Sequence, residues 1–229
     1  MAEPIRIISS MATRQLLTEL LAAFGRESPQ PVQLESVGGV DAAKRVQAGE
    51  AFDIVALASD AIDKLIEAGR LAPHSRVDLV RSGVAVAVRS GATRPDIGSG
   101  EAVRQAVLAA RTLGYSTGPS GVQLARQFER WGIADTIKDR IVQAPPGVPV
   151  GRLVAEGQVE LGFQQLSELM NLPGIEVLGP LPDDIQITTT FSAAVSAACA
   201  RPDAARALLA FMAAPAMDAI KRRNGMEPS

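Results

Sequence analysis

The sequence predicts an α/β protein that folds as two lobes joined by two crossings of the chain. Strand-like and helix-like segments alternate through the first 70 residues, which is typical of βαβ units with a parallel sheet. Two long strand-like runs, at 79–89 and 187–198, flank a central α/β block and can carry the chain between lobes. We therefore expect lobe 1 at residues 1–80 plus 190–229 and lobe 2 at residues 81–189.

Lobe 1 opens with a β-favouring segment, residues 5–8, which ends at two serines and leads into an amphipathic helix. One face of that helix is apolar at helical spacing, through Leu16, Leu17, Leu20, Leu21 and Phe24. Further strands are expected at 32–37 and 53–58, and the second is apolar throughout, as in strands buried on both faces. The helices that follow them are expected at 40–47 and 59–66.

The central block repeats this order of strand, turn and helix. Its strands are expected at 112–116, 159–163 and 175–178. Its helices are expected at 101–110, 122–131 and 148–156, and two further helices, 203–213 and 216–224, complete the chain. This repetition predicts a second α/β lobe.

Polar turns before two helices suggest a site for an anion. Ser9 or Ser10 is expected to cap the first helix, whose first-turn N–H groups lack helical partners. These donors and the positive end of the helix dipole suit a negatively charged ligand. The turn at Ser120 and Gly121 is a second candidate, and Ser59 is expected to cap a third helix. The alternative is that these serines only cap their helices.

Composition excludes several classes of function. A net charge of −2 gives no basis for a nucleic-acid or anionic-membrane partner, and eight aromatic residues argue against a base-stacking platform. We expect neither a metal nor a cofactor, because His/Cys clusters and nucleotide-binding glycine patterns are absent from the sequence. His74 is expected in a solvated loop and Cys199 as a small buried hydrophobe, which leaves no Ser/His/Asp or Cys/His set.

Several segments, in this order and spacing, resemble the type II periplasmic solute-binding proteins, specifically the molybdate-binding family. They are the strand–Ser–Ser–helix opening and residues 52–59, 118–127 and 222–228. The resemblance runs nearly end to end and implies a two-lobed type II fold, each lobe a mixed sheet flanked by helices, with two hinge crossings. It also implies a monomer that binds a small anion in the periplasm, with its leader absent from this sequence and an ABC transporter permease as partner.

By matching position, the resemblance implies ligand contacts from hydroxyls and helix-start N–H groups. The residues concerned are Ser9, Ser10, Met11, Ser59, Ser120, Gly121 and Val122. The chain departs from the family where molybdate binders usually carry a tyrosine, because Phe163-Gln164-Gln165 stands there, and it adds Arg14 in the first helical turn. Gln164 and Arg14 can bind a carboxylate. The alternative is that Gln164 is exposed to solvent at a strand end and that Arg14 is a solvated arginine on a helix surface. These departures favour an organic di- or tricarboxylate over molybdate.

Two functions fit this sequence. One is a solute-binding protein that closes its lobes over an organic anion. The alternative is an isomerase on the same fold, similar to aconitate isomerase, which moves a double bond in a tricarboxylate by proton transfer. Tyr115, Glu168 and Arg14 are then the candidate catalytic residues, although Tyr115 is equally compatible with a half-buried tyrosine at a sheet edge.

Overall fold

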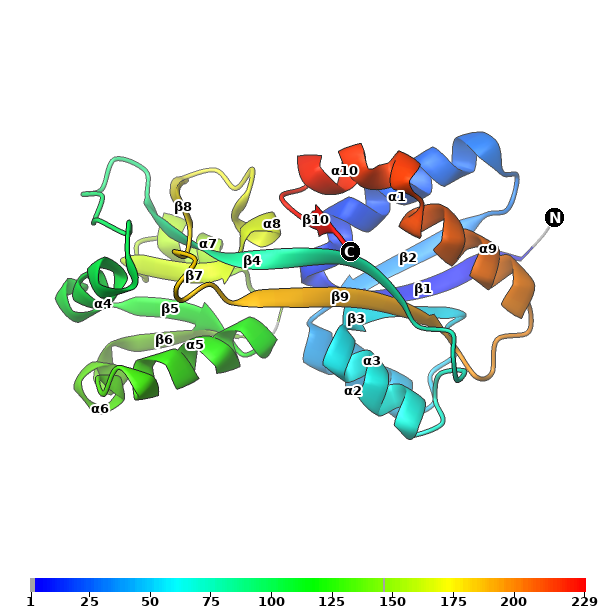
Figure 1. The fold of residues 1–229 in the computed structure, drawn as a ribbon, viewed down its shortest axis with the longest axis horizontal. Helices are drawn as coiled ribbons and strands as arrows, with labels where there is room; N and C mark the ends of the chain where they lie inside the picture. Colours follow the sequence, from blue (N-terminus) through cyan, green and yellow to red (C-terminus); the bar gives the residue numbers. More distant parts are fainter. Residues whose placement is uncertain (1–2, 146) are drawn as a thin grey trace. The chain divides into compact units, whose positions relative to one another are not determined.

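The computed structural model describes residues 3–145 and 147–229 and divides the chain into two compact units. Unit 1 comprises the chain up to Arg81 together with Thr190–Ser229, and unit 2 comprises Ser82–Thr189. The chain leaves unit 1 within strand β4 (Val77–Arg89) and returns within β9 (Thr188–Val195), as Figure 1 shows. The predicted fold class, a two-lobed α/β protein with mixed sheets and two crossings, is confirmed.

A mixed sheet forms the centre of unit 1. Its strands are β1 (Ile5–Ser10), β2 (Val32–Val37), β3 (Ile54–Ala58) and β9, in the order β2-β1-β3-β9. β1 pairs in parallel with β2 and β3, as the alternation of strands and helices predicts, whereas β9 pairs antiparallel to β3. The short β10 (Glu227–Pro228) pairs antiparallel to the first part of β4.

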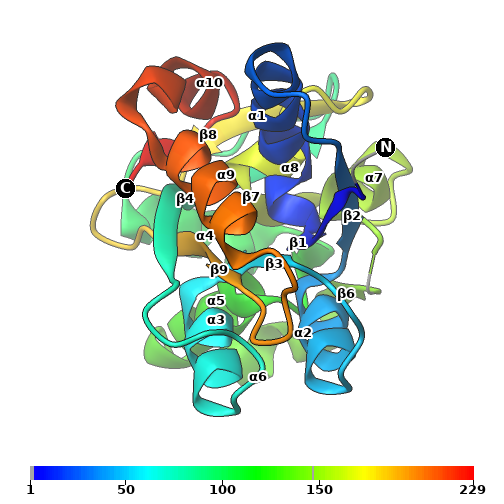
Figure 2. The same cartoon turned by 90° about the vertical axis from the view of Figure 1, so that its right-hand side faces the viewer.

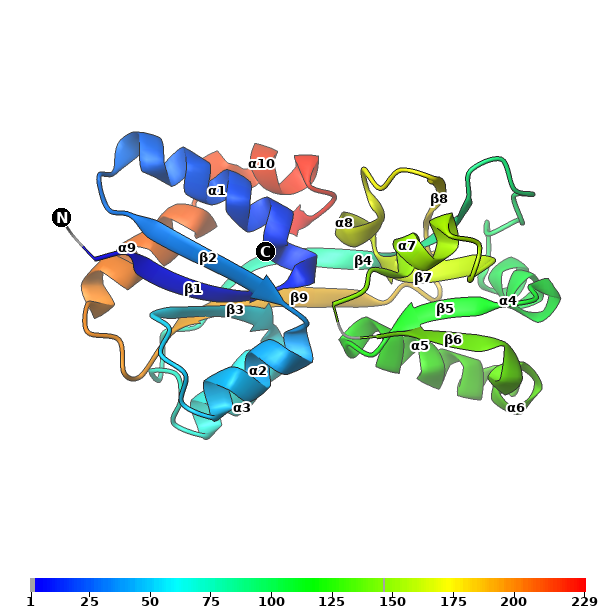
Figure 3. The same ribbon diagram turned by 180° about the vertical axis from the view of Figure 1, so that it is seen from behind.

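Helices cover both faces of the unit 1 sheet, as the views in Figures 2 and 3 show. One face carries the 3₁₀ turn η1 (Met11–Thr13), α1 (Arg14–Glu27), α9 (Pro202–Ala213), the 3₁₀ turn η3 (Pro215–Met217) and α10 (Asp218–Arg223). The other face carries α2 (Gly39–Gln47) and α3 (Ser59–Glu67). Both faces are therefore buried, which explains the continuous apolar run of β3.

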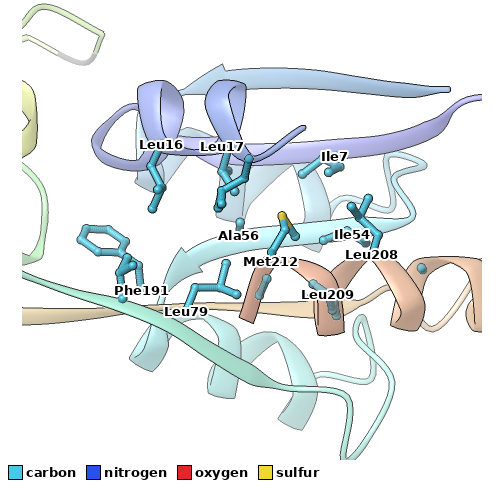
Figure 4. Packing of buried hydrophobic residues seen from close by; sticks show 14 of the residues in the cluster. Ile7, Leu16, Leu17, Ile54, Ala56, Leu79, Phe191, Leu208, Leu209 and Met212 are labelled. Carbon is cyan, nitrogen blue, oxygen red and sulfur yellow. The ribbon is translucent and has the colours of Figure 1, made fainter. Parts of the chain in front are cut away.

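The core of unit 1 follows the alternation of side chains along its strands. Ile7 packs in one cluster with α1 and α9, whereas the next residue, Ile8, packs in the cluster with α2 and α3. Figure 4 shows Leu16 and Leu17 of α1 in the first cluster, which also contains Met212 of α9. Burying a leucine to this degree contributes about 1.5–3 kcal/mol to the free energy of folding. The apolar face predicted for the first helix is confirmed.

Unit 2 is built around a second mixed sheet. Its strands are the second part of β4 and β5 (Leu113–Ser116), β6 (Ile141–Ala144), β7 (Leu161–Gln165) and β8 (Ile175–Pro180). The order is β4-β7-β5-β6, with β5 parallel to both β6 and β7. β4 runs antiparallel to β7 and also pairs with β8.

Helices also lie on both faces of the unit 2 sheet. One side carries α4 (Gly100–Ala109), α5 (Pro119–Arg130), α6 (Ala134–Ile137) and the 3₁₀ turn η2 (Lys138–Arg140). The other side carries the short helices α7 (Val150–Ala155) and α8 (Leu166–Leu169). β6 and α6 were not predicted, because each has only four residues and β6 is mostly half-exposed, so neither has a long periodic pattern. Within the described ranges, every helix is too short or too polar to cross a membrane.

Two predictions about helix starts need correction in detail. Of the two serines expected to cap the first helix, Ser9 lies inside β1, and Ser10 occupies the N-cap position of η1, but its side chain caps no N–H group. The helix expected to be capped by Ser59 has Ala58 at its N-cap and Ser59 as its first residue. Their hydroxyl groups are therefore not used as helix caps.

Candidate functional site

The parallel strands of unit 1 end at one edge of the sheet, and a helix or 3₁₀ turn starts at each (Figure 3). Ser10 is paired with Val37 across β1 and β2, so the starts of η1 at Met11 and α2 at Gly39 follow from neighbouring strand ends. α3 starts at Ser59, directly after β3. First-turn N–H groups have no partner within their own helix, and they lie at the positive end of the helix dipole. This edge therefore offers several donors to an anion.

Ser9 and Ser10 differ in what their hydroxyl groups already contact. Ser9 is fully buried, and its hydroxyl lies 2.7 Å from Ser36 Oγ and donates to the Ser10 carbonyl at 3.2 Å. Among the described residues, the Ser10 hydroxyl has only a long contact, 3.4 Å, with Thr13 Oγ1. A Cβ on Gly39 would lie 3.5 Å from Ser10 Cβ, so the start of α2 lies directly beside Ser10. Ser10 is the serine of this pair whose hydroxyl is more available to a ligand.

The other predicted contacts in unit 1 differ in exposure. Met11 and Ser59 are partly buried at the starts of η1 and α3. Arg14 is exposed at the first position of α1 and forms no ion pair within the part of the chain that the structure describes. Val40, in the first turn of α2, is 46% exposed although it is apolar. The two residues of this turn, Gly39 and Val40, were not predicted; the only sequence signal is the glycine pair after the second strand.

In unit 2 the turn predicted around Ser120 lies at the start of α5, which follows the end of β5 (Figure 1). A Cβ on Gly121 would lie 1.8 Å from the Ser116 carbonyl oxygen, so only glycine allows the helix to start this close to the strand. Ser120 is buried to 7% exposure, whereas Val122 is 48% exposed. The first-turn N–H groups at Ser120 and Gly121 are donors without intrahelical partners.

Gln164 and Gln165 lie inside β7 and are each 3% exposed, so the alternative of a solvated strand end is wrong. Because successive side chains of a strand point to opposite faces, the two amides have different surroundings. Gln164 Oε1 accepts from the Val150 N–H at 2.8 Å. The Gln165 amide lies 2.8 Å from Thr189 Oγ1 and, with its oxygen accepting there, donates to Ser82 Oγ at 2.9 Å.

Glu168 lies in α8, just after β7, and is partly buried. Gln164 Nε2 donates to Glu168 Oε1 at 2.9 Å. Burial raises the pKa of the Glu168 carboxyl group from its ordinary 4.5 to about 7, although the hydrogen bond from Gln164 opposes the rise. A carboxyl group with this pKa can accept and return a proton near neutral pH.

Tyr115 belongs to the core of unit 2. Its side chain is 8% exposed and meets the Phe128 ring edge-on at a centroid distance of 6.1 Å. Burial raises the pKa of its phenol group, which makes the phenolate a poorer candidate for a base. The geometry therefore favours a packing role for Tyr115 over an acid–base role.

The remaining chemical groups named from the sequence lie elsewhere. His74 is exposed in a loop, as expected. Cys199 packs against the core of unit 1, as expected, but it is only partly buried and its thiol donates to Asp53 Oδ1 at 3.2 Å. In residues 3–145 and 147–229, no group of three or more His, Cys, Asp or Glu side chains could hold a metal ion.

Comparison with known proteins identifies the family of this chain and solved structures that share its fold. The model of the family described as bacterial extracellular solute-binding protein matches residues 5–227. An aconitate isomerase of a Pseudomonas species is 40% identical over 187 residues, which cover 80% of this chain and 70% of that protein.

Several solved structures resemble the whole chain. The periplasmic molybdate-binding protein of Azotobacter vinelandii has a TM-score of 0.80 at 19% identity, covering 97% of this chain and 98% of that one. The sulfate-binding protein SubI of Mycobacterium tuberculosis also has a TM-score of 0.80, at 14% identity, covering 98% of this chain and 86% of that one. At these identities the likeness concerns the fold.

Proposed function

Because this chain belongs to the family of bacterial extracellular solute-binding proteins, we propose that it binds an organic polycarboxylate and isomerises it by proton transfer. The observation that carries this proposal is Glu168, a partly buried carboxyl group with a pKa of about 7 at the end of a sheet strand. Near pH 7 such a group is present in both its neutral and its ionised form, so it can exchange a proton with a bound ligand, which binding alone does not require.

The proposed substrate is a tricarboxylate of the aconitate class. The 40% identity with an aconitate isomerase supports this class. The helix starts and hydroxyl groups at Ser10, Ser59 and Ser120 are the proposed donors to the carboxylate groups, with Arg14 as a further donor. The same helix starts carry three further predicted ligand contacts, Met11, Gly121 and Val122. Ser9 also remains a predicted ligand contact, although its hydroxyl is already bonded to Ser36.

The proposed reaction moves one proton and one double bond. The Glu168 carboxylate takes a proton from the methylene carbon next to a substrate carboxylate. The electron pair left on that carbon forms the new double bond, and the old one opens to leave an allylic carbanion whose charge spreads onto the carboxylate oxygens. Glu168 returns the proton to the far carbon of the allyl unit. Hydrogen-bond donors aimed at those oxygens stabilise the developing charge.

The test compares the wild type with Glu168→Gln on cis- and trans-aconitate. The wild type is expected to interconvert the two isomers, which chromatography separates. Loss of a general base lowers the rate by about 10²–10⁴-fold. Glutamine keeps the size of the side chain and its hydrogen bond to Gln164, so calorimetric affinity should be retained. A variant as fast as the wild type would remove Glu168 from the mechanism.

A second candidate function is transport of the same class of anion without chemistry. The matching family and the molybdate- and sulfate-binding neighbours support it. On this alternative the protein is a periplasmic monomer that delivers an organic di- or tricarboxylate to an ABC transporter permease. A ligand that stabilises the protein and is recovered unchanged from the wild type would favour this second function.

A further inference from the structure

The amide of Gln164 joins the start of α7 to the carboxyl group of Glu168. We propose that Gln164 is a positioning residue, held by the Val150 N–H so that its Nε2 donates to Glu168 Oε1 and leaves Oε2 for the substrate proton. This inference rests on the proposed function, because it assigns Glu168 as the base.

The two hydrogen bonds define the orientation of the Gln164 amide. Val150 N is a donor, so it requires the amide oxygen, and the 2.8 Å bond to Oε1 satisfies it. The amide nitrogen must then face Glu168, where it donates to Oε1 at 2.9 Å. The opposite orientation would set two donors against each other at Val150 and two acceptors against each other at the ionised Glu168. Burial of Gln164 to 3% exposure keeps water from replacing either bond.

β4 anchors both the helix that carries Glu168 and the strand that carries Gln164. Leu169, the residue after Glu168, is fully buried with Ala85 and Ala87 of β4, which anchors the short helix α8. Ala85 is also the residue paired with Gln164 in the sheet. α8 has only four residues, so these contacts, rather than the helix itself, set the position of the carboxyl group.

Among the described residues, none of the charged groups on the elements packed against α8 contributes to the shift of the Glu168 pKa, and Asp78 and Arg81 lie on the unit 1 part of β4. Arg152 of α7 pairs with Glu156, and Glu176 of β8 pairs with Arg94. Arg89 lies toward the far end of β4, beyond the pairs that β4 forms with β7. Burial and the Gln164 amide are therefore the two causes that set the pKa of Glu168, and they act in opposite directions.

Removing the amide should move this pKa upward, because the donor favours the ionised carboxylate. In Gln164→Leu, the lower pH limb of kcat/KM should move to higher pH by about one unit. Gln164→Glu still accepts from Val150 but sets a second carboxylate beside Glu168, so it should move the limb in the same direction. Gln143→Leu, an exposed glutamine on β6, is the matched control and should leave the limb in place.

A purely structural role for Gln164 would lower stability or total activity without moving the pH limb, and that result in both variants would overturn the proposal. Gln164→Glu keeps the test available if Gln164→Leu fails to fold. A ¹³C NMR titration of the Glu168 carboxyl group, without substrate, measures the same shift independently of catalysis. A wild type without isomerase activity would overturn the proposed function, and the titration would still decide whether Gln164 controls Glu168.

Discussion

Unit 1 and unit 2 both end their parallel strands at helix starts, but among the described carboxyl groups only one, Glu168 of unit 2, has a raised pKa. In unit 1, hydrogen bonds from arginines lower the pKa of Glu19, Glu35 and Asp78, so these carboxylates stay ionised as partners in ion pairs. In unit 2, burial raises the pKa of Glu168 to about 7. Partly exposed ion pairs of this kind contribute only about 0–1 kcal/mol each, whereas a carboxyl group with a pKa near 7 can transfer protons.

The glycines at the helix starts show a second difference between the units. A Cβ on Gly121 would collide with a backbone oxygen at 1.8 Å, but one on Gly39 would make an ordinary contact at 3.5 Å. Gly121→Ala should therefore lower the free energy of unfolding by about 3 kcal/mol, because the backbone of α5 must shift.

Gly39→Ala is the matched change in unit 1 and should alter the free energy of unfolding by less than about 1 kcal/mol. Urea denaturation of both variants at one pH measures the difference. Equal losses would mean that the two helix starts are packed alike, which contradicts this part of the comparison.

The pKa of Glu168 also affects stability. The folded protein keeps the Glu168 proton up to a pH of about 7, whereas the unfolded chain releases it near 4.5. The folded state binds more protons in that interval, so this group's contribution to stability falls as pH rises, by up to about 3 kcal/mol.

Glu168→Gln removes this contribution. The free energy of unfolding of the variant should therefore rise relative to that of the wild type as pH increases from 4.5 to 7. The ion-paired carboxylates of unit 1 act in the opposite direction, but they are the same in both proteins and cancel in the difference. Urea denaturation of both proteins at several pH values measures this difference. A difference in the free energy of unfolding that stays constant from pH 4.5 to 7 would mean that the pKa of Glu168 is not raised, which contradicts the prediction.

The smallest expected effect separates Ser10 from Ser9. Ser10→Ala should weaken the binding of a tricarboxylate by about 1.5–3 kcal/mol, roughly 10–150-fold in Kd, because one hydrogen bond to a charged group is lost. Ser9→Ala removes the bond to Ser36 and should cost about 1 kcal/mol of stability, and it should weaken binding less than Ser10→Ala does because the Ser9 hydroxyl is already bonded. Calorimetric titration of both variants decides this; equal losses of affinity would place both hydroxyls on the ligand.

Local sequence patterns predicted the longer elements but not the contacts between particular side chains on different elements. The spacing of Leu16, Leu17 and Leu20 predicts the buried face of α1 because helical periodicity is a local property. The difference between Ser9 and Ser10 depends instead on Ser36, which only the register of β1 with β2 brings into contact.

The site in unit 2 shows the same division. Gly121 was predicted from its turn, since a glycine beside Pro119 and Ser120 is a local signal. Gln164 was predicted near the ligand, but its bond to Val150 joins residues 14 positions apart and has no sequence signature. The same holds for Glu168, whose pKa depends on burial that arises only from packing.

The central claim is that Glu168 transfers a proton, and solvent exchange tests it most directly. Proton NMR of trans-aconitate incubated with the protein in heavy water measures whether a carbon-bound hydrogen is replaced by deuterium. We predict that the wild type moves a carbon-bound hydrogen along the allyl unit and incorporates deuterium there whenever the Glu168 proton exchanges with solvent before its return. Glu168→Gln should do both about 10²–10⁴-fold more slowly. A wild type that binds the tricarboxylate and leaves every carbon-bound hydrogen unexchanged and unmoved would contradict the claim.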